Sequence, residues 1–175
     1  MSIYFLKRFQ AKFSKRDQHF LVATDDNDTV VGLAHWCRFR EGEDDEEPKL
    51  GDGGLAPNRA ADPEKEDIIE RSMPHAEHFW KGTSTGCSNR AESWYLSCLA
   101  VDPATQGKGI GRPLVAWGFE QAARDGVCVS VISAKGKEGF YRKVGFGPES
   151  VGSACAGDLN PLNGIDGGDV FFADV

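Results

Sequence analysis

The strongest pattern in the chain is an apolar run that leads into a glycine-rich turn and then into a helical repeat. Residues 94–101 read Trp-Tyr-Leu-Ser-Cys-Leu-Ala-Val, and an Asp-Pro pair follows them. This predicts a buried strand that stops at the pair, because proline has no amide hydrogen for a sheet ladder. Residues 106–111 (Gln-Gly-Lys-Gly-Ile-Gly) predict a turn, and the apolar spacing over 112–124 predicts a helix. Backbone N–H groups just before a helix commonly form a binding site for phosphate.

The remaining hydrophobic periodicity predicts a mixed sheet with helices, an α/β (α+β) fold in one domain over residues 1–175. A polar turn at Asp25–Asp28 joins the first two strands into a hairpin. The expected strands besides 94–101 are 19–24, 29–39, 127–133, 150–156 and 170–174. The expected helices besides 112–124 are an amphipathic one at 2–15 and a short one at 136–144.

Two segments between the hairpin and the central strand look like insertions. Residues 41–62 are acidic and then glycine-rich, which predicts a mobile loop because the charges repel and few apolar groups are present. Residues 63–82 predict a helical insertion with Asp62 as N-cap and Pro63 in the first turn. Pro74 should kink or divide this helix.

Composition and charge narrow the classes of partner. The net charge of −7 disfavours a nucleic-acid partner, which usually meets a basic face. We expect no membrane partner, because the apolar runs are too short to span a bilayer. Five cysteines without paired spacing favour buried reduced thiols in a cytoplasmic protein over disulfides or a metal. The sequence offers no clear third metal ligand to accompany His75 and His78, so no metal site is expected.

The glycine turn alone is a weak motif, but the whole constellation is specific. A strand ending in Asp102-Pro103 precedes Gln106, Gly109 and Gly111, and a helix, a strand and Phe140-Tyr141-x-x-x-Gly145-Phe146 follow. This order resembles the GNAT superfamily of acetyl-CoA-dependent N-acetyltransferases over about residues 30–146. The Ala34-His35-Trp36 strand and the acidic insertion look most like fungal small-molecule members.

The GNAT resemblance implies a mostly antiparallel central sheet flanked by helices. The chain has little room for the usual first strand, so we expect a version that lacks it.

The resemblance implies how acetyl-CoA is bound. Backbone amides of the glycine turn hold the pyrophosphate, because glycine permits close approach and positive φ. The pantetheine arm pairs with the central strand where two neighbouring strands splay apart. Lys108 and Arg112 are either phosphate partners or solvated charges. The implied coenzyme-binding residues are Cys98, Leu99, Val101, Gln106, Gly107, Lys108, Gly109, Ile110, Gly111, Arg112, Ser133 and Tyr141.

The resemblance also implies the chemistry. Tyr141 is the general acid for the departing sulfur, and the backbone amide of Leu99 polarises the thioester carbonyl. The family's basic positions on the central strand are occupied here by Tyr95 and Ser97, and neither is a base at its ordinary pKa. These two residues could order a water instead. Other sources of the base are Glu92, His35, the insertion, or solvent acting on an already neutral amine.

We therefore expect an N-acetyltransferase that moves the acetyl group of acetyl-CoA to a primary amine of a small molecule or a lysine side chain. Direct attack in a ternary complex, without a metal, is the expected mechanism. The alternative is a non-catalytic acyl-CoA-binding or regulatory protein that keeps the coenzyme cleft. A homodimer is also expected, since dimers are common in the superfamily and would cover an exposed edge strand.

Overall fold

One mixed sheet organises the structure, a computed structural model that describes residues 9, 12–13, 15–42, 65, 67–81 and 89–175. Its strand order is β1-β2-β3-β4-β5, and every neighbouring pair is antiparallel except β3 with β4, which is parallel. The strands are β1 (Gln18–Thr24), β2 (Val30–Phe39), β3 (Ser93–Val101), β4 (Cys128–Ala134) and β5 (Gly167–Ala173). The expected mixed, mostly antiparallel α/β sheet is confirmed, and no strand precedes β1 within the described residues.

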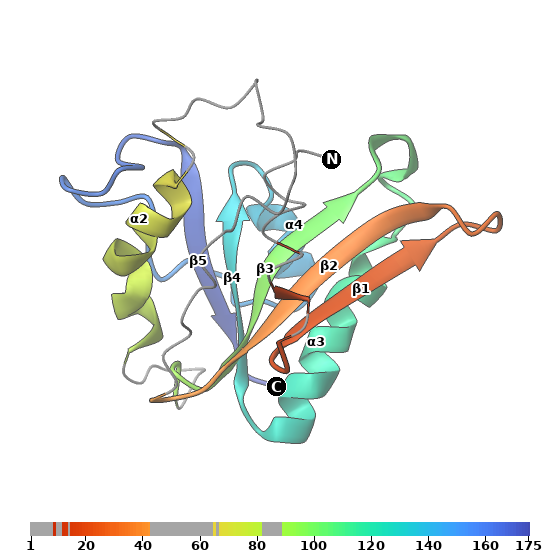
Figure 1. Cartoon of the computed structure of the whole chain (residues 1–175), viewed down its shortest axis with the longest axis horizontal. Helices are drawn as coiled ribbons and strands as arrows, with labels where there is room; N and C mark the ends of the chain where they lie inside the picture. The colour runs from red at the N-terminus through yellow and green to blue at the C-terminus, as the bar shows by residue number, and fades with distance from the viewer. Residues whose placement is uncertain (1–8, 10–11, 14, 43–64, 66, 82–88) are drawn as a thin grey trace.

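Helices cover both faces of the sheet (Figure 1). Helix α3 (Gly111–Asp125) and helix α4 (Glu138–Lys143) lie behind it in this view, whereas α2 (Ile68–Ala76) lies to the left, on the side of β5. Helix α2 continues as the 3-10 helix η2 (Glu77–Trp80), and a further 3-10 turn, η3 (Pro103–Thr105), follows β3. Each face of the sheet is therefore covered by its own helices, against which its apolar side chains are buried.

The hairpin of β1 and β2 follows from its turn chemistry. The Asp25 carboxylate accepts hydrogen bonds from the amides of Asn27 and Thr29, both at 2.9 Å. Asp28 adopts a left-handed conformation with φ of 59°, which aspartate tolerates better than most residues. The predicted turn at Asp25–Asp28 and the two strands around it are confirmed.

Two hydrophobic clusters form the core, one on each face. The cluster on the α3 and α4 face includes Ala34, Trp36, Trp94, Leu96, Leu114, Val115, Ala122, Val129, Val131, Tyr141, Phe146 and Phe171. The cluster on the α2 face includes Ala76, Trp80, Cys128, Ala154, Val170 and Phe172. Alternate residues of β4 thus face opposite layers, as expected for a strand buried on both sides.

Helix α3 packs closely on β2 at Gly118. A Cβ atom at this glycine would lie 2.2 Å from Cζ2 of Trp36, so only glycine lets the helix approach the indole. The indole Nε1 of Trp36 donates to the carbonyl of Leu114 at 3.1 Å. The helix ends at Gly126, whose φ of 67° is the left-handed cap that Asp125-Gly126 predicts.

Several expectations need correction. The predicted strand at 150–156 is wrong: this stretch forms turns with a single bridge between Ser153 and Asp169. Its glycines and short polar residues favour turns over a ladder. Helix α2 begins only at Ile68, with Asp67 as its N-cap residue, and it passes through Pro74 before it tightens to a 3-10 turn at Glu77. The proposed cap at Asp62 lies outside the described residues.

Other expectations fall mainly on residues that the structure does not describe. Of the predicted helix at 2–15, Phe9 and Lys12 are described as helical. The predicted mobile loop at 41–62 lies outside the described residues except at Glu41 and Gly42, which form a turn. Cys37, Cys98 and Cys155 are not in disulfides, but Cys128 is disulfide-bonded, which corrects the expectation of reduced thiols throughout.

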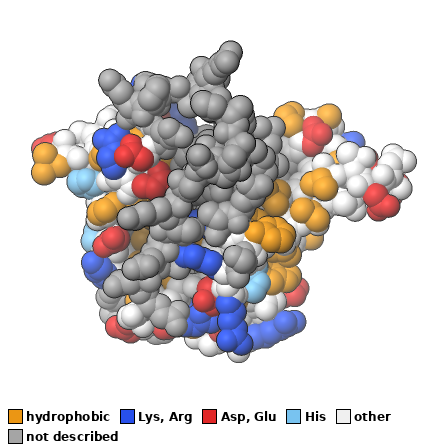
Figure 2. Space-filling view, viewed as in Figure 1, with side chains coloured by type: hydrophobic (Ala, Val, Ile, Leu, Met, Phe, Trp, Pro, Cys, Tyr) orange, Lys and Arg blue, Asp and Glu red, His pale blue; other side chains and the backbone are white. Residues whose placement is uncertain are grey.

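The surface facing the viewer in Figure 2 carries hydrophobic side chains gathered over β1 and β2. Val22 and Val30 of this hairpin are more than half exposed. A hollow of about 380 Å³ at the outer edge of β1 is lined by Phe13, Gln18, His19, Phe20, Leu21 and Trp117. Within the described part of the chain, no helix is long and apolar enough to cross a membrane.

Candidate active site

A β-bulge at Ser97 bends the central strand. Leu96 of β3 lies opposite Trp36 of β2, whereas Cys98 lies opposite the adjacent residue His35. Ser97 is therefore an extra residue between two pairs. A bulge increases local twist and re-aims the side chains beyond it. Leu96 and Leu99 accordingly both reach the cluster on the α3 and α4 face, although regular alternation would place them on opposite faces.

Beyond the bulge, β3 separates from β4. The parallel ladder joins Ser93–Leu96 to Cys128–Val131 and then stops. The next residues of β4, Ile132–Ala134, pair only with β5 among the described strands. Figure 1 shows β3 and β4 side by side where they begin and diverging towards their arrowheads, with α4 behind the gap. The backbone of Cys98, Leu99 and Val101 thus faces a gap where an extended amide chain could add as a strand.

Tyr141 of α4 faces this gap. Its side chain is 8 % exposed and packs against Phe140 and Phe146, with ring centroids 5.3 and 5.6 Å away. Burial, with a smaller contribution from the nearby Cys98 thiol, raises the pKa of Tyr141 to about 12. The hydroxyl thus keeps its proton to higher pH than an ordinary tyrosine, and it lies close enough to Cys98 for the two groups to interact.

The glycine turn leads from the gap into α3. The Asp102 carboxylate accepts from the amide of Ala104 at 2.8 Å and starts η3. The Gln106 side-chain amide donates to the Val101 carbonyl at 3.1 Å, so this side chain braces the turn. Gly107 and Gly109 have φ of 80° and 84°, and no atom lies within 4 Å of where their Cβ atoms would be. The turn is thus open as well as left-handed.

The start of α3 has the features of an anion site. Within the described residues no side chain caps it, and Ile110 occupies the cap position. Its first amides therefore carry the partial positive charge of the helix N-terminus. Lys108 and Arg112 are exposed on either side. Gly111 fits tightly, since a Cβ there would lie 3.2 Å from Cζ of Phe140 and would press α3 away from α4.

Ser133 lies on the β4 side of the gap and is fully buried. Its hydroxyl donates to the Ala134 carbonyl at 3.0 Å, so it is already engaged with the backbone. The structure thus brings the residues expected to bind coenzyme around one gap: the exposed edge of β3, the glycine turn, the start of α3, Ser133 and Tyr141.

The residues expected to handle the amine proton are more scattered. Tyr95 lies before the bulge and packs between Phe39 and Trp80 on the α2 face, with ring centroids 5.1 and 5.6 Å away. Ser97 is the bulge residue itself.

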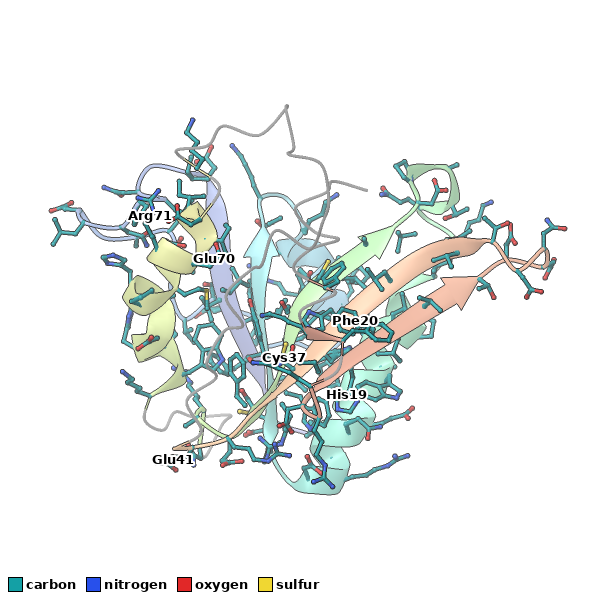
Figure 3. The ribbon with its side chains drawn as sticks, viewed as in Figure 1. His19, Phe20, Cys37, Glu41, Glu70 and Arg71 are labelled. Carbon is teal, nitrogen blue, oxygen red and sulfur yellow. The ribbon has the colours of Figure 1, made fainter. Side chains whose placement is uncertain are left out.

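Glu92 is held in an ion pair at the far end of β3. Its carboxylate accepts from the Arg38 guanidinium at 2.6 Å and from the Glu41 amide at 2.9 Å. Burial acts to raise the pKa of Glu92, but these hydrogen bonds and the charges of Arg38 and Arg40 outweigh it and lower the pKa. Figure 3 shows Glu41 at the lower end of β2, away from Phe20 and Cys37. Six residues of strand, about 20 Å, separate Glu92 from Cys98, so Glu92 does not reach the gap.

His35 is the candidate base that the structure brings near the gap, because it lies opposite Cys98. Its Nε2 lies 2.7 Å from Oε1 of Gln18, and the Cys37 thiol donates to the same oxygen at 3.0 Å. Sequence reasoning did not single out Gln18 or Cys37. The alternation of the hairpin could have placed Gln18 and Phe20 on one face, but the pairing that joins them to His35 requires the register.

Comparisons with known proteins agree with this geometry. Residues 75–148 match a family model described as "Acetyltransferase (GNAT) domain". A Corynebacterium glutamicum structure described as histone acetyltransferase HPA2 and related acetyltransferase is similar, with 15 % identity and a TM-score of 0.53. The similarity covers 99 % of this chain and 76 % of that one. AtaT, solved with acetyl-methionyl-tRNAfMet, has 18 % identity and a TM-score of 0.51, covering 98 % and 79 %. No curated protein matches at the sequence level.

The matched segment contains β3, the glycine turn, α3, β4 and Tyr141. It therefore includes all the elements that surround the gap. The chain has the fold of the GNAT acetyltransferases.

Proposed function

We propose that the protein is an acetyl-CoA-dependent N-acetyltransferase. The observation that carries this proposal is the gap between β3 and β4, with a buried tyrosine at one side and an uncapped helix start behind an open glycine turn. These features suit the three parts of acetyl-CoA: an extended amide arm, a thioester and a pyrophosphate. The backbone of Cys98–Val101 pairs with the arm, and the amides of Gly107–Gly111 hold the phosphates.

Leu99 and Tyr141 act on different atoms of the thioester. The Leu99 amide stabilises negative charge that develops on the thioester oxygen as the amine attacks. The Tyr141 hydroxyl then donates a hydrogen bond to the departing sulfur. Because its pKa of about 12 exceeds the ordinary thiol value of about 8.5, Tyr141 stabilises the thiolate without giving up its proton fully.

We propose a primary amine as the acceptor, on a small molecule or a lysine side chain. The net charge of −7 favours a cationic acceptor and disfavours nucleic acid, although AtaT was solved with a tRNA. A cytoplasmic location and a homodimer that covers the β1 edge are further parts of the proposal. Lys108 and Arg112 assist the phosphate site.

A second candidate function is a non-catalytic acyl-CoA-binding or regulatory protein. The observation that favours it is the lack of a basic side chain at Tyr95 and Ser97, before and at the bulge of β3. This candidate keeps the coenzyme gap and predicts binding without turnover.

The test is release of free thiol from acetyl-CoA in the presence of polyamines, arylamines, amino acids, aminoglycosides and a histone peptide. Calorimetry with CoA is run in parallel. Binding with acceptor-dependent thiol release supports the enzyme. Binding without release on any acceptor favours the non-catalytic candidate, and absence of binding contradicts both.

A further inference from the structure

The two edges of the described sheet differ in what covers them. The outer edge of β5 is covered by residues 147–154, because the amides of Gly147, Val151 and Ala154 donate to β5 carbonyls at 3.0, 2.9 and 2.8 Å. Strand β1 forms the other edge (Figure 1), and within the described residues β2 is its only neighbour. Beyond β2, no described backbone group bonds to the backbone of residues 19–24. An edge of this kind can accept a further strand.

The backbone of β1 presents alternate residues at this outer edge. The Arg38 amide donates to the Asp17 carbonyl at 2.9 Å, so these two residues form a hydrogen-bonded pair of the antiparallel ladder. Because such pairs alternate with non-hydrogen-bonded ones, the N–H and C=O groups of Phe20 and Val22 point away from β2. The Gln18 amide fits this pattern, since it donates back into the preceding turn at 3.2 Å. Phe20 and Val22 therefore offer donors and acceptors to an added strand.

The side chains of β1 do not protect this edge. Natural edge strands commonly carry lysine or proline, which block pairing with another chain. Residues 18–24 read Gln-His-Phe-Leu-Val-Ala-Thr and contain no lysine, arginine, acidic residue or proline. Val22 is 58 % exposed, and the hollow of about 380 Å³ at the same edge is lined by residues that include Phe13, Phe20 and Trp117. An exposed apolar surface of this kind indicates an interaction site.

Charges of opposite sign lie at the two ends of β1. The turn before the strand carries Arg16, which is exposed, and Asp17 in the same turn is paired with Arg40. The turn after the strand carries Asp26 and Asp28, which are also exposed. The strand is seven residues long, about 23 Å, so the two turns cannot meet within one copy. A second β1 running antiparallel would place its acidic turn beside the basic turn of the first.

We propose that two copies of this chain pair through β1, antiparallel and about a two-fold axis, so that their sheets become one continuous sheet. The N–H and C=O groups of Phe20 and Val22 supply the ladder between the copies, and each Arg16 lies near the acidic turn of the other copy. This gives residues and a geometry to the homodimer of the proposed function, and it does not depend on acetyl transfer.

The first experiment is a charge swap, read out by sedimentation equilibrium over a range of protein concentrations. Arg16→Glu and Asp26→Lys each bring like charges together, and a two-fold dimer contains each junction twice. We expect each single variant to raise the dimer Kd by about 5- to 30-fold. The double variant Arg16→Glu/Asp26→Lys restores opposite charges and should return to the wild-type Kd. Because the two residues cannot meet within one copy, such recovery reports pairing between copies.

A second pair of variants tests the edge itself. Val22→Lys places a charge beside the added strand and should raise the dimer Kd by about tenfold or more. Val30→Lys is the matched control, because Val30 is 57 % exposed on the same hairpin but belongs to β2, away from the edge. It should leave the Kd unchanged. Both substitutions are at exposed positions, and circular dichroism checks that both proteins fold.

Three outcomes would overturn the inference: a wild-type protein that stays monomeric, a Val22→Lys protein that dimerises as tightly as wild type, or a charge-swapped double variant that does not recover. Thiol release from acetyl-CoA is measured on the same wild-type preparation. A monomer that releases thiol with an acceptor would overturn this inference and support the proposed acetyl transfer. A dimer of the proposed geometry without release would do the reverse.

Discussion

At the residue scale, Tyr141 shows how burial changes the pKa of one side chain. The GNAT resemblance implied a donor to sulfur at this position, and the fold buries the ring against Phe140 and Phe146, where burial raises the pKa of Tyr141 to about 12. We expect Tyr141→Phe to lower kcat by about 10²-fold or more while CoA affinity changes little. Steady-state kinetics and calorimetry on the same preparation check this, and unchanged turnover would contradict Tyr141 as the donor to the departing sulfur.

The same residue predicts a pH dependence of stability. Because the folded protein holds the Tyr141 proton up to about pH 12, whereas an unfolded tyrosine releases it near pH 10, the unfolded state binds fewer protons between these values. The free energy of unfolding should therefore be intact below pH 10 and fall by about 3 kcal/mol by pH 12. Urea unfolding at pH 9 and 11.5 measures it. Tyr141→Phe should show a smaller drop, and equal drops would contradict the assignment.

Among the elements, α3 depends on a close approach to β2 that its sequence only hints at. The helical stripe predicted the buried side of α3, but it gave no reason to treat Gly118 as special. The structure supplies that reason, because the Trp36 ring fills the space of the missing side chain. Apolar periodicity therefore predicts which face is buried and not how closely it packs.

We expect Gly118→Ala to be destabilising despite the better helix propensity of alanine. Propensity favours alanine by about 1 kcal/mol, whereas overpacking against a buried indole costs typically 1–3 kcal/mol. The expected result is a lower melting temperature and a lower urea midpoint. Ala116→Ser, at an exposed position of the same helix, should be nearly neutral. A Gly118→Ala protein as stable as wild type would show that the indole can move aside.

The elements also show where sequence reasoning stopped. β1, β2, β3, β4, α3 and α4 were predictable, since each has a clear period or a turn signal at its ends. The bulge at Ser97 was not, because a bulge is a property of the pairing between two strands, and Ser97 alone has nothing unusual about it. The strand predicted at 150–156 was wrong because this stretch hydrogen-bonds to β5 through Val151, Gly152 and Ala154 without forming a regular ladder.

At the scale of the whole molecule, the gap lies between the two parallel strands of the described sheet. β3 and β4 are joined by α3, and this crossover is long enough for them to run in the same direction. Below the bulge, Arg38 ties this pair together: its guanidinium contacts Glu92 before β3 at 2.6 Å and Asp125 at the end of α3 at 3.1 Å. Different residues thus set the end where β3 and β4 are paired and the end where they separate.

This arrangement explains why Glu92 and His35 could not be distinguished from the sequence. Glu92 and His35 were equal candidates by residue type. The fold places them differently. Glu92 is held in an ion pair with Arg38 where β3 and β4 are paired, whereas His35 lies opposite Cys98, near where the two strands separate. The proposed coenzyme-binding residues were easier to group from the sequence, because most of them are close together in one stretch of chain.

Calorimetric titration of CoA into wild type and Gly109→Val tests the central claim most directly. The claim is that the glycine turn and the start of α3 bind the coenzyme phosphates. The φ of 84° at Gly109 excludes valine without strain, although the space around it is open. We predict one binding site in the wild-type protein, loss of binding in Gly109→Val, and wild-type affinity in the control Ala116→Ser. Absence of binding in the wild type, or full affinity in a folded Gly109→Val protein, would contradict the account.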